Sequence, residues 1–66
     1  MSLRVQEVSV DGSFIHPEHY GDAAKAAGVA AGIAARASEQ LLFVKVMDDR
    51  TTDWRLIDSF PAARRT

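Results

Sequence analysis

The stretch DAAKAAGVAAGIAARAS, residues 22 to 38, decides the fold because eleven of its seventeen residues are Ala or Gly. Ala has the highest helix propensity, and Asp is favoured at a helix N-cap. The stretch predicts a helix that begins at Asp22 and runs to about Glu39 or Gln40, roughly 27 to 30 Å long. Pro17 offers an alternative, earlier start, since proline is well tolerated in the first turn.

The segment before this helix predicts a strand and a hairpin. Residues 3 to 10, LRVQEVSV, are rich in Val, but their apolar alternation changes phase. A bulge near Gln6-Glu7, or different pairing at the two ends, accounts for that change. Asp11-Gly12 is typical of the two central residues of a type I′ turn, so we expect a short second strand over Ser13 to His16.

Two further strands are predicted after the helix. Residues 41 to 47, LLFVKVM, have one charged residue and predict a strand buried on both faces, with Leu41 and Phe43 on the same side. Residues 54 to 60, WRLIDSF, alternate and predict a half-exposed strand in which Trp54, Leu56 and Phe60 share a face. Pro61 ends this strand, and residues 61 to 66 are expected to form a frayed basic tail.

The order β-(β)-α-β-β predicts an α+β fold, with one Ala/Gly-rich helix packed on a three- or four-stranded, mainly antiparallel sheet. We expect residues 1 to 66 to form a single small domain. The layout resembles the dodecins, small flavin-binding oligomers whose pocket uses a Trp in the strand after the helix. Residues 41 to 47 contain no Trp, so the resemblance implies element order only, and neither a flavin nor a site.

Composition limits the function classes. The chain has 66 residues, no Cys and a formal net charge of −1, with 47% hydrophobic and 26% charged residues. Disulfides, Cys-based metal sites and thiol catalysis are excluded, and no overall charge attracts nucleic acid or an anionic membrane. The absence of a basic segment followed by a long apolar run predicts a cytoplasmic protein without a membrane partner.

A chain of this size has a small core, and association between copies is a common supplement to its stability. Gly28 and Gly32 form a GxxxG spacing on one side of the predicted helix, where a second helix backbone could approach closely. The alternative is a half-buried helix with a bland exposed side. The predicted self-association surface comprises Ala24, Gly28, Ala31, Gly32, Ala35, Leu41 and Phe43.

The sequence His16-Pro17-Glu18-His19 holds the only candidate chemistry. His16, His19 and Asp22 follow spacings of three, so two imidazoles and a carboxylate could converge on a metal ion such as zinc. HxxH spacings are common in loops, where the imidazoles cap a helix or face solvent. The sequence therefore favours a protein that is not an enzyme and carries no metal or other cofactor.

Three functions remain open, in this order of preference. The first is a non-enzymatic interaction or accessory module that forms a homodimer or higher homo-oligomer, or binds a different protein. The second is a binder of small ligands at a subunit interface near Trp54. The third is a nucleic-acid-binding regulator, disfavoured by the acidic residues nearby, that would use Arg50, Arg55, Arg64 and Arg65.

Overall fold

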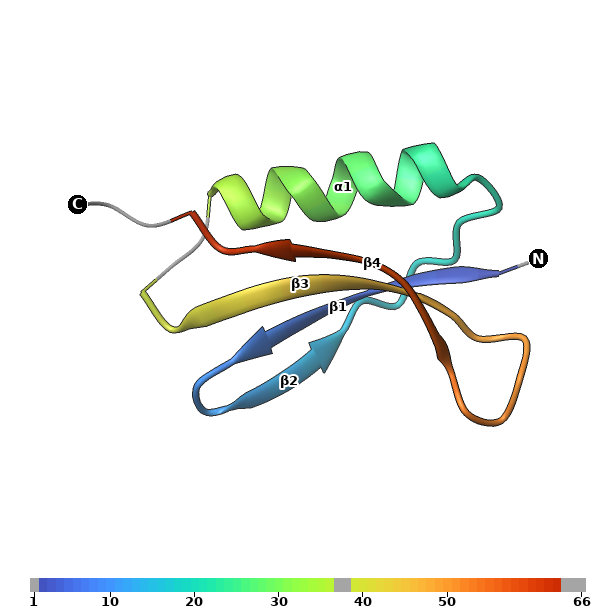
Figure 1. Ribbon diagram of the computed structural model, residues 1–66, viewed down its shortest axis with the longest axis horizontal. Coiled ribbons are helices and arrows are strands. Elements are labelled where there is room, and N and C mark those ends of the chain that lie inside the picture. The colour runs from blue at the N-terminus through green and yellow to red at the C-terminus, as the bar shows by residue number, and fades with distance from the viewer. Residues whose placement is uncertain (1, 37–38, 64–66) are drawn as a thin grey trace.

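A computed structural model of the chain describes residues 2–36 and 39–63. Its elements in chain order are β1 (Leu3–Ser9), β2 (Gly12–Ile15), α1 (Ala23–Ala35), β3 (Leu41–Asp48) and β4 (Arg55–Pro61). The strands form one sheet in the order β2-β1-β3-β4, and every neighbouring pair is antiparallel. The helix lies along one face of this sheet (Figure 1), which confirms the predicted α+β fold.

The helix is shorter than the sequence predicts. Asp22 is its N-cap, as expected, and its carboxylate accepts a hydrogen bond from the Ala24 N–H at 3.0 Å. The helix ends at Ala35, however, with Arg36 as the C-cap, and it has 13 residues rather than 18 to 20. The Arg36 N–H donates to both the Gly32 and Ile33 carbonyls, a bifurcated arrangement common at helix ends. The prediction that it continues to Glu39 or Gln40 is wrong, because both residues lie in a turn that leads into β3.

The core lies between the helix and the two central strands. The helix contributes three buried residues, and all three are alanines: Ala26, Ala30 and Ala34. The largest fully buried side chains come from the sheet, namely Leu3, Val5, Val44 and Val46. The small helix side chains thus form a flat surface against larger aliphatic residues of the sheet.

The first hairpin turns one residue earlier than predicted. Ser9 pairs with Gly12, so Val10 and Asp11 form the turn and Gly12 opens β2. Within the described residues only Gly12 has a clearly positive φ, +143°, whereas a type I′ turn needs positive φ at both central residues. The type I′ prediction is therefore wrong, and the glycine supplies its unusual backbone conformation just after the turn.

Two register shifts decide which side chains reach the core. Between β1 and β3 the register shifts at Val8/Ser9, not at Gln6-Glu7, and this leaves Leu42 without a partner on β1. Leu41 consequently lies in the core with Val44, and is 3% exposed. The prediction that Leu41 lies beside Phe43 on the self-association surface is therefore wrong.

The second shift lies between β3 and β4. Met47 pairs with Leu56 and Val46 pairs with Asp58, so Ile57 has no partner in the register. Phe60 packs against the core under the helix, whereas Leu56 lies on the other side of the sheet and is 53% exposed. The prediction that Leu56 and Phe60 share a face is wrong, because the extra residue reverses the alternation between them.

The fold also extends past its predicted end. Pro61 belongs to β4, and Ala62 is buried and donates its N–H to the Leu42 carbonyl at 3.1 Å. The Ala63 N–H donates to the Ala34 carbonyl at 3.0 Å, which ties the chain to the end of the helix. Residues 61 to 63 are thus not a frayed tail, and residues 64 to 66 lie outside the described part. In the described ranges, no helix has the length and apolar character needed to cross a membrane.

Candidate functional site

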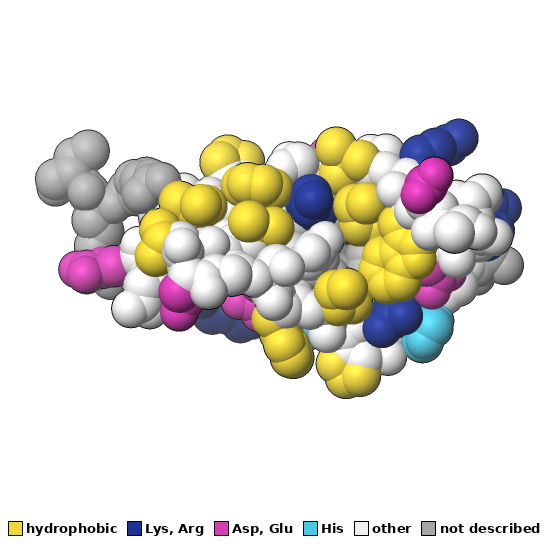
Figure 2. Space-filling view, turned by 90° about the horizontal axis from the view of Figure 1, so that it is seen from below, with side chains coloured by type: hydrophobic (Ala, Val, Ile, Leu, Met, Phe, Trp, Pro, Cys, Tyr) yellow, Lys and Arg dark blue, Asp and Glu magenta, His cyan; other side chains and the backbone are white. Residues whose placement is uncertain are grey.

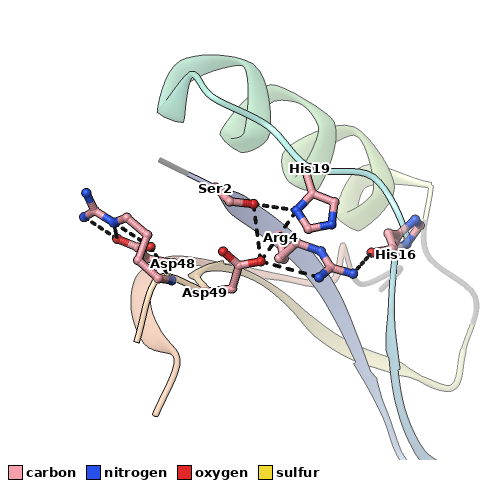
Figure 3. Close-up of polar contacts among 7 residues, drawn as sticks. Ser2, Arg4, His16, His19, Asp48 and Asp49 are labelled. Atoms are coloured by element: carbon pink, nitrogen blue, oxygen red, sulfur yellow. Dashed lines mark hydrogen bonds and ion pairs between the residues drawn. The ribbon is translucent and has the colours of Figure 1, made fainter. Parts of the chain in front are cut away.

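A polar cluster joins three distant parts of the chain at one end of the sheet (Figure 3). Oδ2 of Asp49 accepts hydrogen bonds from Ser2 Oγ at 3.3 Å and Arg4 Nη1 at 3.5 Å, and lies 3.6 Å from His19 Nδ1. Ser2 Oγ is also 2.5 Å from His19 Nδ1. The Asp49 N–H donates to the Ser2 carbonyl, so the cluster fixes the start of β1 beside the end of β3.

Ser, His and Asp in contact suggest hydrolysis, but the geometry does not match a catalytic triad. In a triad the serine and the carboxylate use different nitrogens of the imidazole, so that one nitrogen takes the proton while the other is held. Here Ser2 and Asp49 both approach Nδ1 of His19. The His19 side chain is also 58% exposed, which leaves the imidazole in water. The cluster is suited to holding chain segments together.

The candidate metal ligands lie apart. His16 Nε2 contacts the Glu7 carboxylate at 2.6 Å, and the His16 ring packs edge-on against Phe14. His19 points instead toward Ser2 and Asp49, while Asp22 is occupied as the helix cap. Across residues 2–36 and 39–63, no three His, Cys, Asp or Glu side chains lie close enough together to hold a metal ion. The predicted convergence of His16, His19 and Asp22 is therefore wrong.

Of the four arginines predicted to bind nucleic acid, Arg50 is held by Asp48. Arg50 Nε donates to Asp48 Oδ2 at 2.8 Å, and the Arg50 backbone N–H donates to Asp48 Oδ1 at 3.0 Å. Hydrogen bonds from the Arg50 side chain and backbone, more than its charge, hold the pKa of Asp48 below its ordinary value, and the pKa of Arg50 is raised in return. Arg55 lies opposite Asp48 in the sheet. Arg64 and Arg65 lie outside the described residues, so the use of all four arginines stays a prediction.

The sheet face away from the helix carries large apolar side chains; we call it the open face (Figure 2). The register places the following residues on it: Arg4, Gln6, Val8, Ile15, Phe43, Lys45, Met47, Leu56 and Ser59. Leu56 is 53% and Ile15 40% exposed, and Phe43 and Val8 are half-buried. Figure 2 shows hydrophobic side chains on both sides of a basic one.

Trp54 lies at the end of the open face, next to the polar cluster. The Arg4 guanidinium carbon lies 5.3 Å from the centre of its ring, within range of a cation–π interaction. Arg4 also donates from Nη2 to the His16 carbonyl at 3.0 Å. One face of the ring is thus covered by the protein itself, which gives the predicted ligand site near Trp54 no support.

The helix residues of the predicted self-association surface, which we call the helix strip, face outward. Ala24, Gly28, Ala31 and Ala35 are exposed, and Gly32 is half-buried. A Cβ atom added at Gly28 or Gly32 would meet no other atom within 4 Å. Nothing within the described chain therefore requires glycine at these positions, although each glycine costs helix stability relative to Ala.

No family model matches the chain, and searches of curated proteins and of solved structures returned no significant match.

Proposed function

We propose that this protein is a non-enzymatic interaction module that acts as a homodimer or higher homo-oligomer. The observation that carries the proposal is the small size of its core. Four aliphatic side chains are the largest that are fully buried, and the helix adds only alanines. Burial contributes about 25 cal/mol per Å² of apolar surface, so such a core leaves a monomer with little reserve of stability.

The apolar surface left outside that core supports the same proposal. Large exposed apolar residues occur on both hairpins, and they include Val10, Phe14, Ile15, Leu56 and Ile57. Of these, Ile15 and Leu56 lie on the sheet face away from the helix and Phe14 lies on the opposite face. Exposed apolar side chains on that outer face are typical of an interaction site. Burial of this surface against another chain would supply what the monomer core lacks.

The absence of enzymatic function is part of the proposal. The only Ser-His-Asp contact in the described chain has the wrong arrangement at the imidazole, and its histidine is exposed. We place the protein in the cytoplasm as part of the same proposal. A different protein as partner is the alternative to a second copy.

Light scattering behind a sizing column, at low micromolar concentration, tests this proposal. The chain mass is 7.2 kDa, so a dimer is expected to give twice this value. A monomer mass over the whole accessible concentration range would refute self-association. Native mass spectrometry of the same sample would reveal any protein partner or small molecule that co-purifies.

A further inference from the structure

We propose that two copies of the chain associate edge to edge, β2 against β2, in an antiparallel register centred on Phe14. This inference rests on the proposed self-association and names the strand responsible. The sheet has two edge strands, β2 and β4, and they differ in how well they can accept another strand.

The β4 edge is poorly suited to pairing. Ile57 interrupts the register with β3, and Pro61 lacks an N–H group. Arg55 and Asp58 add charge to the same strand. Bulges, prolines and charges are the features by which edge strands avoid joining other strands, so pairing along β4 would be irregular.

The β2 edge has none of these features. Its four residues, Gly12–Ile15, include no proline and no charged side chain, and the register with β1 runs without a shift. Figure 1 shows β2 at the outer edge of the sheet, and the helix packs against β1, β3 and β4 but not against β2. Phe14 and Ile15 are exposed on opposite faces of this strand. A strand beside β2 would therefore meet apolar side chains and no charge.

Two broader surfaces fit a second copy less well. Lys45 lies in the middle of the open face, where it forms no salt bridge within residues 2–36 and 39–63, so it would repel its own copy. The helix strip exposes alanines and glycines, which bury little apolar surface. Association at the β2 edge avoids both difficulties.

The hydrogen bonds of β2 show which of its backbone groups face the edge. The His16 N–H donates to the Val5 carbonyl at 2.9 Å. Because antiparallel strands alternate between bonded and non-bonded pairs, the N–H and C=O groups of Phe14 also point toward β1. Those of Ser13 and Ile15 point away from it. A new strand would therefore form hydrogen bonds at Ser13 and Ile15.

One antiparallel register uses both of these residues on each copy. With the twofold axis at Phe14, Ser13 of each copy lies opposite Ile15 of the other, and four backbone hydrogen bonds can form. An axis at Ile15 would set Ser13 opposite Pro17, which has no N–H group. An axis at Ser13 would set Ile15 opposite Asp11, which lies in the turn. The backbone thus favours the axis at Phe14.

The same register suits the side chains. The two copies of Phe14 face each other in a non-hydrogen-bonded pair, in which side chains lie closest, and aromatic pairs of this kind stabilise sheets. Gly12 lies opposite His16, so the residue without a side chain leaves room for the ring that packs against Phe14. The two copies of Asp11 lie at opposite ends of the interface, roughly 20 Å apart. The strand is therefore complementary to itself, and the occupant is a second copy.

A disulfide trap tests this register directly, because the chain has no cysteine of its own. Phe14→Cys places two thiols across the axis at a Cα separation of about 4.5 Å, which suits a disulfide. Ile57→Cys is the matched control, an exposed apolar residue of the other hairpin. In a glutathione redox buffer, we expect Phe14→Cys to form the covalent dimer at least about tenfold faster, measured by mass spectrometry. Circular dichroism checks that both variants are folded.

Proline substitution provides a second measurement, made on the backbone. Ile15→Pro removes an N–H group that faces the edge and leaves every hydrogen bond to β1 in place. Each dimer loses two hydrogen bonds, so its dissociation constant, measured by sedimentation, should rise by about tenfold or more. Ile15→Thr, which keeps the N–H group and the β-branched shape, should change it by no more than about threefold.

The outcomes separate this inference from the proposed function. If the protein is a dimer but Ile57→Cys cross-links as fast as Phe14→Cys, or Ile15→Pro leaves the dissociation constant unchanged, the β2 interface is overturned and self-association stands. A chain that stays monomeric, with neither cysteine variant cross-linking faster than the other, overturns both.

Discussion

The two faces of this sheet are built from the same strands but differ in what packs against them. The covered face packs Leu3, Val5, Val44 and Val46 against three alanines of the helix, and little of it reaches water. The open face carries Phe43, which is half-buried, Leu56, which is 53% exposed, and Met47, which is only 8% exposed. Small residues on the helix thus allow a close-packed layer on one face, while Leu56 on the other face stays largely in contact with water.

The two faces also differ in whether their charged side chains are paired. Asp48 lies at the end of the covered face, is 5% exposed, and is fully engaged by Arg50. Lys45 lies in the middle of the open face, and its ammonium lies 5.8 Å from the centre of the Phe43 ring. A buried charge needs a partner, whereas a charge next to water does not. The pairing of Asp48 therefore contributes to the fold of the chain itself, whereas Lys45 forms no salt bridge with a carboxylate of residues 2–36 or 39–63.

The largest expected difference between the faces is the cost of removing a leucine. Leu41→Ala removes a side chain that is 3% exposed, so we expect a loss of about 2 to 5 kcal/mol in the free energy of unfolding. Leu56→Ala on the open face is the matched control, with an expected loss below about 1 kcal/mol in the monomer. Urea unfolding at several protein concentrations, extrapolated to the lowest, measures both losses, since association adds to the apparent stability. Equal losses would show that the faces are not differently packed.

The next test adds atoms instead of removing them. Ala30→Leu places a large side chain at a position with 0% exposure between helix and sheet, and overpacking there should cost about 1 to 3 kcal/mol. Ala31→Leu changes the next residue, which faces outward, and should alter stability by no more than about 0.5 kcal/mol. If Ala30→Leu leaves the free energy of unfolding unchanged in the same urea measurement, stability does not depend on the close approach of helix and sheet.

These two faces could be predicted from the sequence only in part. The helix, its Asp22 cap and its inward alanines follow from helix propensity and from the 3.6-residue period. The faces of the last two strands do not, because each contains or borders an extra residue, Leu42 or Ile57, that shifts the alternation. Such a shift depends on how neighbouring strands pair, and local alternation cannot locate it.

The polar cluster was missed for a different reason. Ser2, His19 and Asp49 are separated by 17 and 30 positions, and no spacing rule relates them. They meet because Leu3 pairs with both Asp48 and Tyr20, which brings the flanking residues together. Conversely, the HxxH spacing predicted a convergence that does not form, because His16 and His19 leave the backbone on different sides of the chain.

Arg4 joins that cluster to the open face, and its replacement should have a smaller effect. Arg4→Lys keeps the charge but loses the planar group that lies over Trp54 and reaches the His16 carbonyl, with an expected loss of about 0.5 to 1.5 kcal/mol. Trp54 is the only tryptophan, so its fluorescence should also shift when the guanidinium is removed. Arg36→Lys at the exposed helix end is the control. A spectrum unchanged by Arg4→Lys would contradict the stacking.

The smallest effect at neutral pH is expected from Asp48→Asn, because Asn keeps the size of the side chain and one oxygen that accepts from Arg50. Its value lies in the pH dependence. Hydrogen bonds from Arg50 lower the pKa of Asp48 from its ordinary value of 3.8, so the folded state favours the ionised form. A carboxyl whose pKa is lowered on folding stabilises the protein above its unfolded pKa, and this contribution is lost as pH falls through the folded pKa.

Thermal melts of the unmodified protein and of Asp48→Asn should therefore differ most near pH 7. The difference should shrink below about pH 4 and vanish once Asp48 is protonated in both states. If the Asp48→Asn difference persists at pH 2, the carboxylate does not stabilise the covered face through its charge, and the contrast between a paired and an unpaired charge fails.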